Sequence, residues 1–212
     1  FAPMVQGNFV HLTFALCLCA ALASAMEIPK FCRKVIYDKS STGVALKENS
    51  PLDGSLEANQ ILVKVYAAAI NPVDYKIPKL LPLSGRGVGL DFSGQIVKTG
   101  TGVKDFKVGD SVFGVGNGGT LADYCIADAS KIAIKPAKAS YVEAASLSTV
   151  GLTSLQALKD NGVKENSRLL VLGASGGCGI TGIQVSMLYI RVMGVHTRLR
   201  RTSNATASTR TC

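Results

Sequence analysis

The chain has 212 residues, of which 47% are hydrophobic and 17% are charged, and its formal net charge is +9. This length and composition exclude a disordered chain and predict one large or two small folded domains. Six arginines and no acidic residue follow Ser167, so most of the excess positive charge lies near the carboxyl end. The sequence contains no basic stripe interleaved with aromatic residues, so it gives no indication of a nucleic-acid partner.

The chain starts with an apolar segment, residues 9–25, which ends in Ala23-Ser24-Ala25. Such small residues are typical of a signal-peptidase site, but no basic residue precedes the segment, and Met26 begins an ordinary amino terminus. We expect residues 1–26 to be an untranslated leader or a presequence, with a membrane anchor as a third alternative. A start at Met26 predicts a cytoplasmic protein, whereas a presequence predicts a plastid or secretory route.

Short segments rich in Val, Ile, Tyr and Phe follow, separated by turn residues. Residues 48–51 are typical of such a turn. Spacings near ten residues predict a compact, barrel-like β domain over residues 27–139. The strands are expected at residues 34–38, 60–71, 89–100, 110–116 and 121–128.

The pattern changes at Ser140, which forms a capping box with Glu143. One helix is expected from there to the stop signal Asn161-Gly162. The apolar run RLLVL, residues 168–172, predicts a buried parallel strand, and a glycine-rich turn and a helix over residues 178–190 follow it. This order is the first half of a βαβ unit, so the sequence predicts an α/β fold with a β-rich domain and the start of a Rossmann domain over residues 140–190.

The glycine-rich turn fits an A-x-G-x-x-G variant of the dinucleotide fingerprint. Glycine allows the chain to reverse, the backbone to approach a pyrophosphate, and the helix to pack closely. A phosphate-binding P-loop is excluded because no Lys-Ser/Thr pair follows, and a turn with a purely structural role is the alternative. The candidate cofactor-binding residues here are Ala174, Ser175, Gly176, Gly177, Cys178 and Gly179.

Four segments in order resemble one family: AAAINPVDYKI (67–77), GLDFSGQIVKTGTGVKDFKVGDSVFG (89–114), AASLSTVGLTSLQAL (144–158) and LLVLGASGGCG (169–179). Together they resemble the medium-chain dehydrogenase/reductase superfamily, and within it the zinc-free quinone oxidoreductases related to zeta-crystallin and to the plastid-envelope enzymes. The resemblance implies a chaperonin-10-like β-barrel domain followed by the first βα unit of a Rossmann domain. It also implies NADPH as cofactor and hydride transfer to a quinone or an α,β-unsaturated carbonyl (enone).

The resemblance also bears on the metal. Zinc-dependent members carry a Cys shortly before an Asp and a Gly-His-Glu triplet, whereas here Asn71 stands three residues before Asp74 and the triplet reads Gly89-Leu90-Asp91. Because zinc needs such nitrogen and sulfur donors, we expect no metal site. Asn71 and Tyr75 are then the candidate catalytic residues, as hydrogen-bond donors to the substrate. Thr153 matches a family position near the cofactor. Turn-forming, packing or helix-internal roles are the alternatives for these three side chains.

The resemblance stops near Val185. A second strand ending in Asp, Glu or Arg should follow for the ribose, but residues 191–212 are rich in Arg, Thr and Ser without periodicity. We interpret them as an aberrant tail, produced by a frame shift or a truncation, and expect the 212-residue chain itself to be inactive. The full-length product is expected to act on a small-molecule quinone or enone, with a homodimer as one assembly. A non-catalytic dinucleotide-binding protein on the same fold is the alternative.

Overall fold

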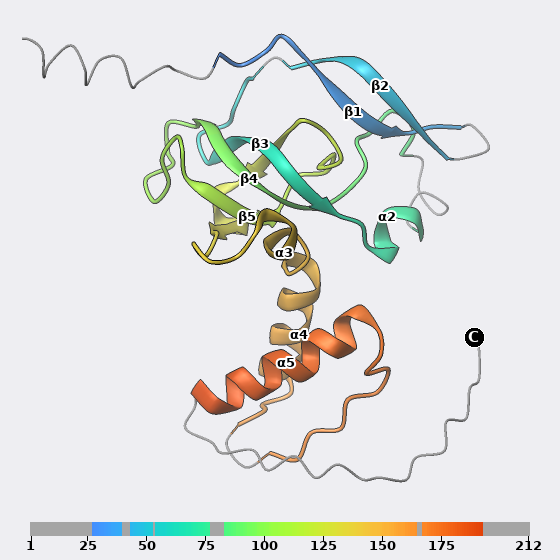
Figure 1. The fold of residues 1–212 in the computed structure, drawn as a ribbon, viewed down its shortest axis with the longest axis vertical. Helices are drawn as coiled ribbons and strands as arrows, with labels where there is room; N and C mark the ends of the chain where they lie inside the picture. Colours follow the sequence, from blue (N-terminus) through green and yellow to red (C-terminus); the bar gives the residue numbers. More distant parts are fainter. Residues whose placement is uncertain (1–26, 40–42, 53, 77–82, 165–166, 193–212) are drawn as a thin grey trace, which may run out of the picture.

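The computed structural model describes residues 27–39, 43–52, 54–76, 83–164 and 167–192, and only the backbone of residues 189–192. A β-rich part lies at the top in Figure 1, and the helices of the second half of the chain extend below it. Five antiparallel strands form the main sheet, in the order β6-β3-β4-β5-β7. They are β3 (Gln60–Ala69), β4 (Asp91–Thr99), β5 (Ser111–Val115), β6 (Tyr124–Asp128) and β7 (Ile132–Ile134).

The hydrophobic core lies on one face of this sheet. Alternating residues of the strands point to the same face, so Ile61 and Val63 of β3 meet Phe92 and Ile96 of β4, and all four side chains are fully buried. Cys125 of β6 belongs to the same cluster, and burial raises the pKa of its thiol. The predicted β-rich fold is therefore confirmed, and the prediction of strands in all five segments agrees with the structure.

Two strands, β2 (Val44–Pro51) and β7, were not predicted. Strand β1 (Phe31–Tyr37) pairs with β2 as an antiparallel hairpin, with Phe31 opposite Pro51. The prediction of a turn at residues 48–51 is therefore wrong. These polar residues have low strand propensity, but the ladder with β1 holds them extended at a solvent-exposed edge, where side-chain preference matters little. The short strand β7 pairs with the three central residues of β5.

Four α-helices are described: α2 (Pro72–Lys76), α3 (Tyr141–Ala145), α4 (Ser148–Asp160) and α5 (Gly177–Val192). The capping box of Ser140 and Glu143 is confirmed, with the Glu143 amide 3.2 Å from the Ser140 hydroxyl. The single helix expected after it is divided at Ser146, whose hydroxyl donates to the Glu143 carbonyl. No helix in the described ranges is both long and apolar enough to span a membrane.

The predicted strand at residues 168–172 is wrong. These residues have no regular structure, and Leu170 and Leu172 expose 82% and 84% of their surface. A strand needs a neighbour for its backbone hydrogen bonds, and in the described ranges every strand belongs either to the hairpin or to the antiparallel sheet. The segment instead runs alongside α4 and α5 as an extended connection (Figure 1).

The packing of β3 on β4 can be tested at a glycine. A Cβ atom added at Gly94 would lie 2.1 Å from the Lys64 carbonyl oxygen, so the two backbones would have to move apart. We expect Gly94→Ala to lower the free energy of unfolding by about 1–3 kcal/mol or more. Gly151→Ala is the matched control, because nothing lies within 4 Å of its added Cβ and alanine favours a helix by up to about 1 kcal/mol. Urea unfolding followed by circular dichroism measures both, and equal stabilities would contradict the close approach.

Candidate functional site

The candidate catalytic turn, Asn71–Lys76, closes on itself through backbone contacts. The Asn71 N–H donates to the Asp74 carboxyl at 2.7 Å, and the Asp74 N–H donates to the Asn71 carbonyl at 3.0 Å. Pro72 occupies the first helical position, where its missing N–H costs nothing. The buried Tyr37 hydroxyl donates to the Asp74 carbonyl at 2.8 Å, so the turn is tied to β1.

The carboxyl group of Asp91, at the start of β4, joins the turn to the next helix. One oxygen accepts the Asn71 amide at 2.9 Å and the Thr149 N–H at 3.1 Å, and the other accepts the Thr149 hydroxyl at 2.6 Å. Asp91 is 1% exposed. Helix α4 has no side-chain cap from its own preceding residue. Asp91 therefore caps α4 from another element, satisfying a first-turn amide where an acidic group is also favoured by the helix dipole.

The two predicted catalytic donors lie on one turn but point differently. Asn71 is buried, and its side-chain amide is directed at Asp91. An amide group has two hydrogens, so this contact uses one of them. Tyr75 is 55% exposed, so solvent reaches its side chain. The catalytic role of both residues stays a prediction.

The predicted cofactor turn precedes α5 directly. Gly173 adopts a φ of +69°, and its carbonyl accepts the Gly176 N–H at 3.0 Å, while the Gly176 carbonyl accepts the Ile180 N–H at 2.9 Å. A Cβ at Gly179 would lie 2.1 Å from the Gly173 oxygen, so glycine is needed there for the turn itself. A Cβ at Gly176 would meet only that oxygen, at 3.5 Å. The turn therefore has room for a side chain at Gly176 but not at Gly179.

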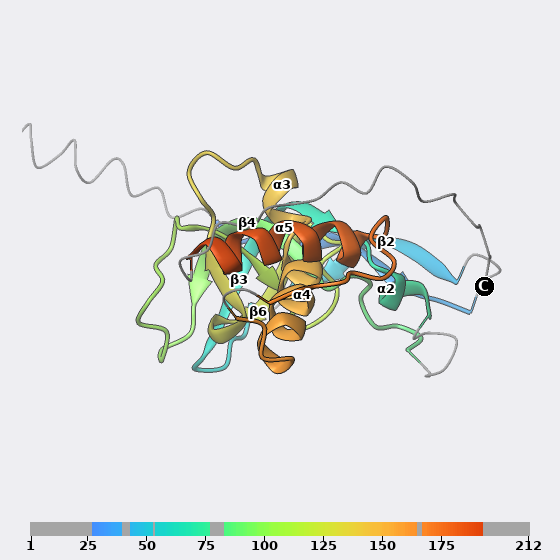
Figure 2. The same cartoon turned by 90° about the horizontal axis from the view of Figure 1, so that it is seen from below.

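Thr153 and the glycine turn come together across α4 and α5. The Ser154 hydroxyl of α4 donates to the Cys178 carbonyl at 3.2 Å. A cavity of about 460 Å³ is lined by exposed Thr153 together with Cys178 and Gly179. Ala174, Ser175, Gly176 and Gly177 complete the turn but do not line this cavity. In both Figures 1 and 2, α2 and the turn before α5 lie on the same side of the molecule.

Sequence reasoning missed Asp91 and Thr149 as residues of the site. Asp91 was interpreted only as part of the altered triplet, and Thr149 lay inside the expected helix without a role of its own. No signal in the sequence marked their contact, because the helix was expected to begin at the capped Ser140 and the start of α4 at Ser148 is seen only in the structure. In the described ranges no group of three or more His, Cys, Asp or Glu side chains is close enough to hold a metal ion, and the expectation of no zinc site stays a prediction.

Comparison with known proteins identifies the β-rich part. Residues 57–137 match the family described as the alcohol dehydrogenase GroES-like domain. A trans-enoyl reductase from Aspergillus terreus is 38% identical over 183 residues, which are 76% of this chain and 49% of the relative. The chloroplast envelope quinone oxidoreductase homolog of Arabidopsis thaliana is 36% identical over 147 residues, covering 62% of this chain and 45% of the relative.

A solved structure shows the same arrangement. Escherichia coli quinone oxidoreductase, determined in complex with NADPH, superposes with a TM-score of 0.65 at 28% identity, covering 76% of this chain and 50% of that one. Residues 57–137 thus form a GroES-like domain, and helices α4 and α5 with the glycine turn between them follow it. The β-rich part is an alcohol dehydrogenase GroES-like domain, and the chain has homologues in the medium-chain dehydrogenase/reductase superfamily, quinone oxidoreductases among them, as its four motifs predicted. It spans about half the length of the curated relatives it matches.

The turn formed by Asn71–Lys76 also predicts that the stability of the protein depends on pH. Burial raises the pKa of Asp74, the charge of Asp91 adds to the rise, and the Asn71 N–H opposes it. Because the pKa is higher in the folded state, the contribution to stability is full below the unfolded value near 3.8 and is lost as the pH rises through the folded value. Asp74→Asn should therefore gain stability relative to the unmodified chain as the pH rises above this unfolded value.

Urea unfolding at several pH values tests this expectation. Asn keeps an oxygen that can accept the Asn71 N–H, so the contact at the turn is preserved. Asp105→Asn removes a carboxyl from an exposed loop and controls for the change in net charge. A stability difference for Asp74→Asn that shrinks with rising pH would contradict the assigned shift.

Proposed function

We propose that the protein is an NADPH-dependent reductase that transfers hydride to a quinone or an α,β-unsaturated carbonyl without zinc. The observation that carries the proposal is the glycine turn at the start of α5, with open space at Gly176 and close packing at Gly179. The named activities of the homologues, trans-enoyl reductase and quinone oxidoreductase, support the reaction class. The NADPH complex of the Escherichia coli enzyme supports the cofactor.

The residues present fit a dinucleotide. The first N–H groups of a helix have no partner within the helix and attract an anion, and those of Gly177 and Cys178 are at this position in α5. Gly176 leaves room for a pyrophosphate next to them. Thr153 borders the cavity that the turn shares with α4. When bound, the nicotinamide supplies the hydride.

The chain's own residues would then position and polarise the acceptor. A carbonyl oxygen that gains negative charge is stabilised by hydrogen-bond donors already in place. Tyr75 offers an exposed hydroxyl for this purpose, and Asn71 offers the second hydrogen of its amide. Since Asp91 fixes the orientation of Asn71, the donor needs little reorganisation as the charge develops.

Cofactor binding is tested at the glycine turn. Gly176→Val should weaken NADPH binding at least about tenfold, or about 1.4 kcal/mol, because the side chain occupies the pyrophosphate position while the turn has room for it. Gly179→Ala is the comparison, since it should disturb the turn itself and lower stability as well as binding. NADPH fluorescence titration and thermal unfolding measure both effects. Unchanged affinity in Gly176→Val would assign the turn a purely structural role.

Catalysis is tested at Tyr75. Removing one donor to a developing oxyanion typically lowers kcat by about 100-fold or more, so Tyr75→Phe should slow quinone-dependent NADPH oxidation by that order without changing NADPH affinity. Tyr66→Phe, which removes a hydroxyl from another partly exposed tyrosine, is the control and should retain full turnover. Both changes are made in a version of the protein extended to the length of its relatives. NADPH binding without turnover in that unmodified protein would instead support the non-catalytic alternative.

A further inference from the structure

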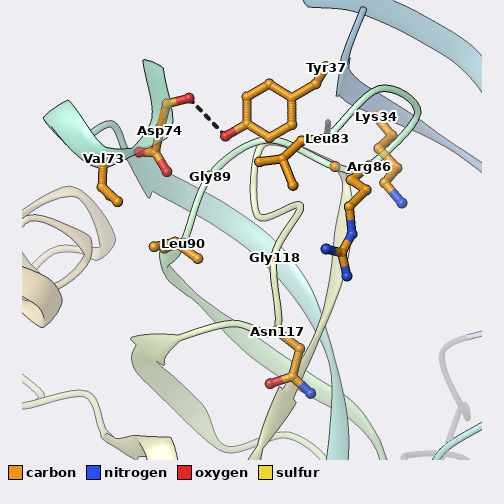
Figure 3. A pocket seen from close by; sticks show the side chains of 11 residues that line it. Lys34, Tyr37, Val73, Asp74, Leu83, Arg86, Gly89, Leu90, Asn117 and Gly118 are labelled. Carbon is orange, nitrogen blue, oxygen red and sulfur yellow. Dashed lines mark hydrogen bonds between the residues drawn. The ribbon is translucent and has the colours of Figure 1, made fainter. Parts of the chain in front are cut away.

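A second cavity, of about 420 Å³, lies between α2 and the hairpin β1–β2 (Figure 3). Lys34 and Arg86 stand on one side of it, and Val73 and Asp74 of α2 stand on the other. We call it the Lys34–Arg86 cavity. Its volume falls within the usual range for small-molecule sites, and none of the residues of the glycine turn line it.

The two cations are held next to each other by backbone pairing. Arg86 belongs to a turn in which its N–H donates to the Leu83 carbonyl at 2.9 Å, and its own carbonyl accepts the Tyr37 N–H at 2.9 Å. Gly87 then forms a bridge with β1. The aliphatic part of the Lys34 side chain passes close to Gly87, because a Cβ atom added at Gly87 would lie 2.7 Å from the Cε atom of Lys34. Both charged groups therefore reach the same cavity from adjacent backbone segments.

Among the residues that the structure describes, neither cation has an acidic partner. Within the described ranges the ion pairs are Arg33–Asp123 and Lys131–Asp128, and neither includes Lys34 or Arg86. Asp74 is the one acidic residue in the lining. It is only 5% exposed, and its carboxyl already accepts the Asn71 N–H. The cavity therefore carries an excess of positive charge that its own residues do not neutralise.

Part of the remaining wall is apolar, and Asn117 and three glycines form the rest. Leu83, Leu90 and Val73 contribute hydrocarbon. Tyr37 adds its ring, because its hydroxyl is turned to the Asp74 carbonyl. An arginine guanidinium presents parallel donors that match the two oxygens of an oxyanion, and a lysine adds a point charge. Cations beside an apolar wall complement a molecule that has an anionic head and a short hydrocarbon chain.

We propose that the Lys34–Arg86 cavity binds a small amphipathic organic anion. Its carboxylate or phosphate head pairs with Arg86 and Lys34, and its chain packs against Leu83 and Leu90. The proposal does not rest on the proposed reductase activity, because it uses neither the glycine turn nor Tyr75. The ligand would contact α2 from the side of Val73, and so would occupy a second site next to the candidate catalytic turn.

The test titrates the 212-residue chain with hexanoate, hexyl phosphate and 1-hexanol, followed by amide chemical shifts in NMR. Hexanoate should bind at least tenfold more tightly than hexanol, with the largest shifts at Gly87, Gly118 and neighbouring amides. Comparison of hexanoate with hexyl phosphate identifies the preferred head group. Because the three probes share one chain length, the comparison isolates the charge without any change to the protein.

Variants provide the second arm. Lys34→Met keeps the aliphatic stem over Gly87, and combined with Arg86→Gln it should abolish the preference for hexanoate. Lys104→Gln with Lys159→Gln removes two positive charges from exposed positions elsewhere and should leave binding unchanged. Equal affinity for hexanoate and hexanol, shifts centred outside the cavity, no binding of any probe, or an unaltered preference in the folded double variant would each overturn the proposal.

Discussion

The arrangement of the site depends on one buried acidic side chain. Asp91 has three donors on its two oxygens, supplied by Asn71 and Thr149. These donors belong to elements far apart in sequence, and Asp91 is only 1% exposed. A buried polar group without partners costs about 1–3 kcal/mol, so turn, strand and helix are stable together in an arrangement that satisfies all of them.

From Asp91 the geometry extends in two directions. In one, Asn71 and the closed turn of α2 place Tyr75 on the surface. In the other, Thr149 fixes the start of α4, whose Ser154 contacts the carbonyl of Cys178. The candidate donors and the glycine turn are therefore connected through hydrogen bonds that begin at the same carboxyl group. This connection gives the acidic residue of the altered triplet a structural use for both of its carboxyl oxygens.

Sequence reasoning succeeded where the determinants are local. The alternating apolar residues of β3 and β4 and the capping box at Ser140 can be recognised from neighbouring residues alone.

Sequence reasoning failed where the partner of a residue lies far away in the chain. The Asp91–Thr149 contact joins residues 58 positions apart, and the polar strand β2 exists because β1 pairs with it. Residues 168–172 have the composition of a buried strand, but an apolar sequence cannot supply the neighbouring strand that would bury it. The glycine turn was located correctly from its spacing, whereas the separate tasks of Gly176 and Gly179 required coordinates.

The most direct test of this account is a double-mutant cycle between Asp91→Asn and Thr149→Val, measured by urea unfolding. Val keeps the shape of Thr149 but lacks the hydroxyl, and Asn replaces one acceptor oxygen by a donor. If Asp91 holds α4 through this contact, the two changes should be coupled by about 0.5–3 kcal/mol, and Thr149→Ser should retain most of the stability. Strictly additive effects of the two changes would contradict the central place of Asp91 in the structure.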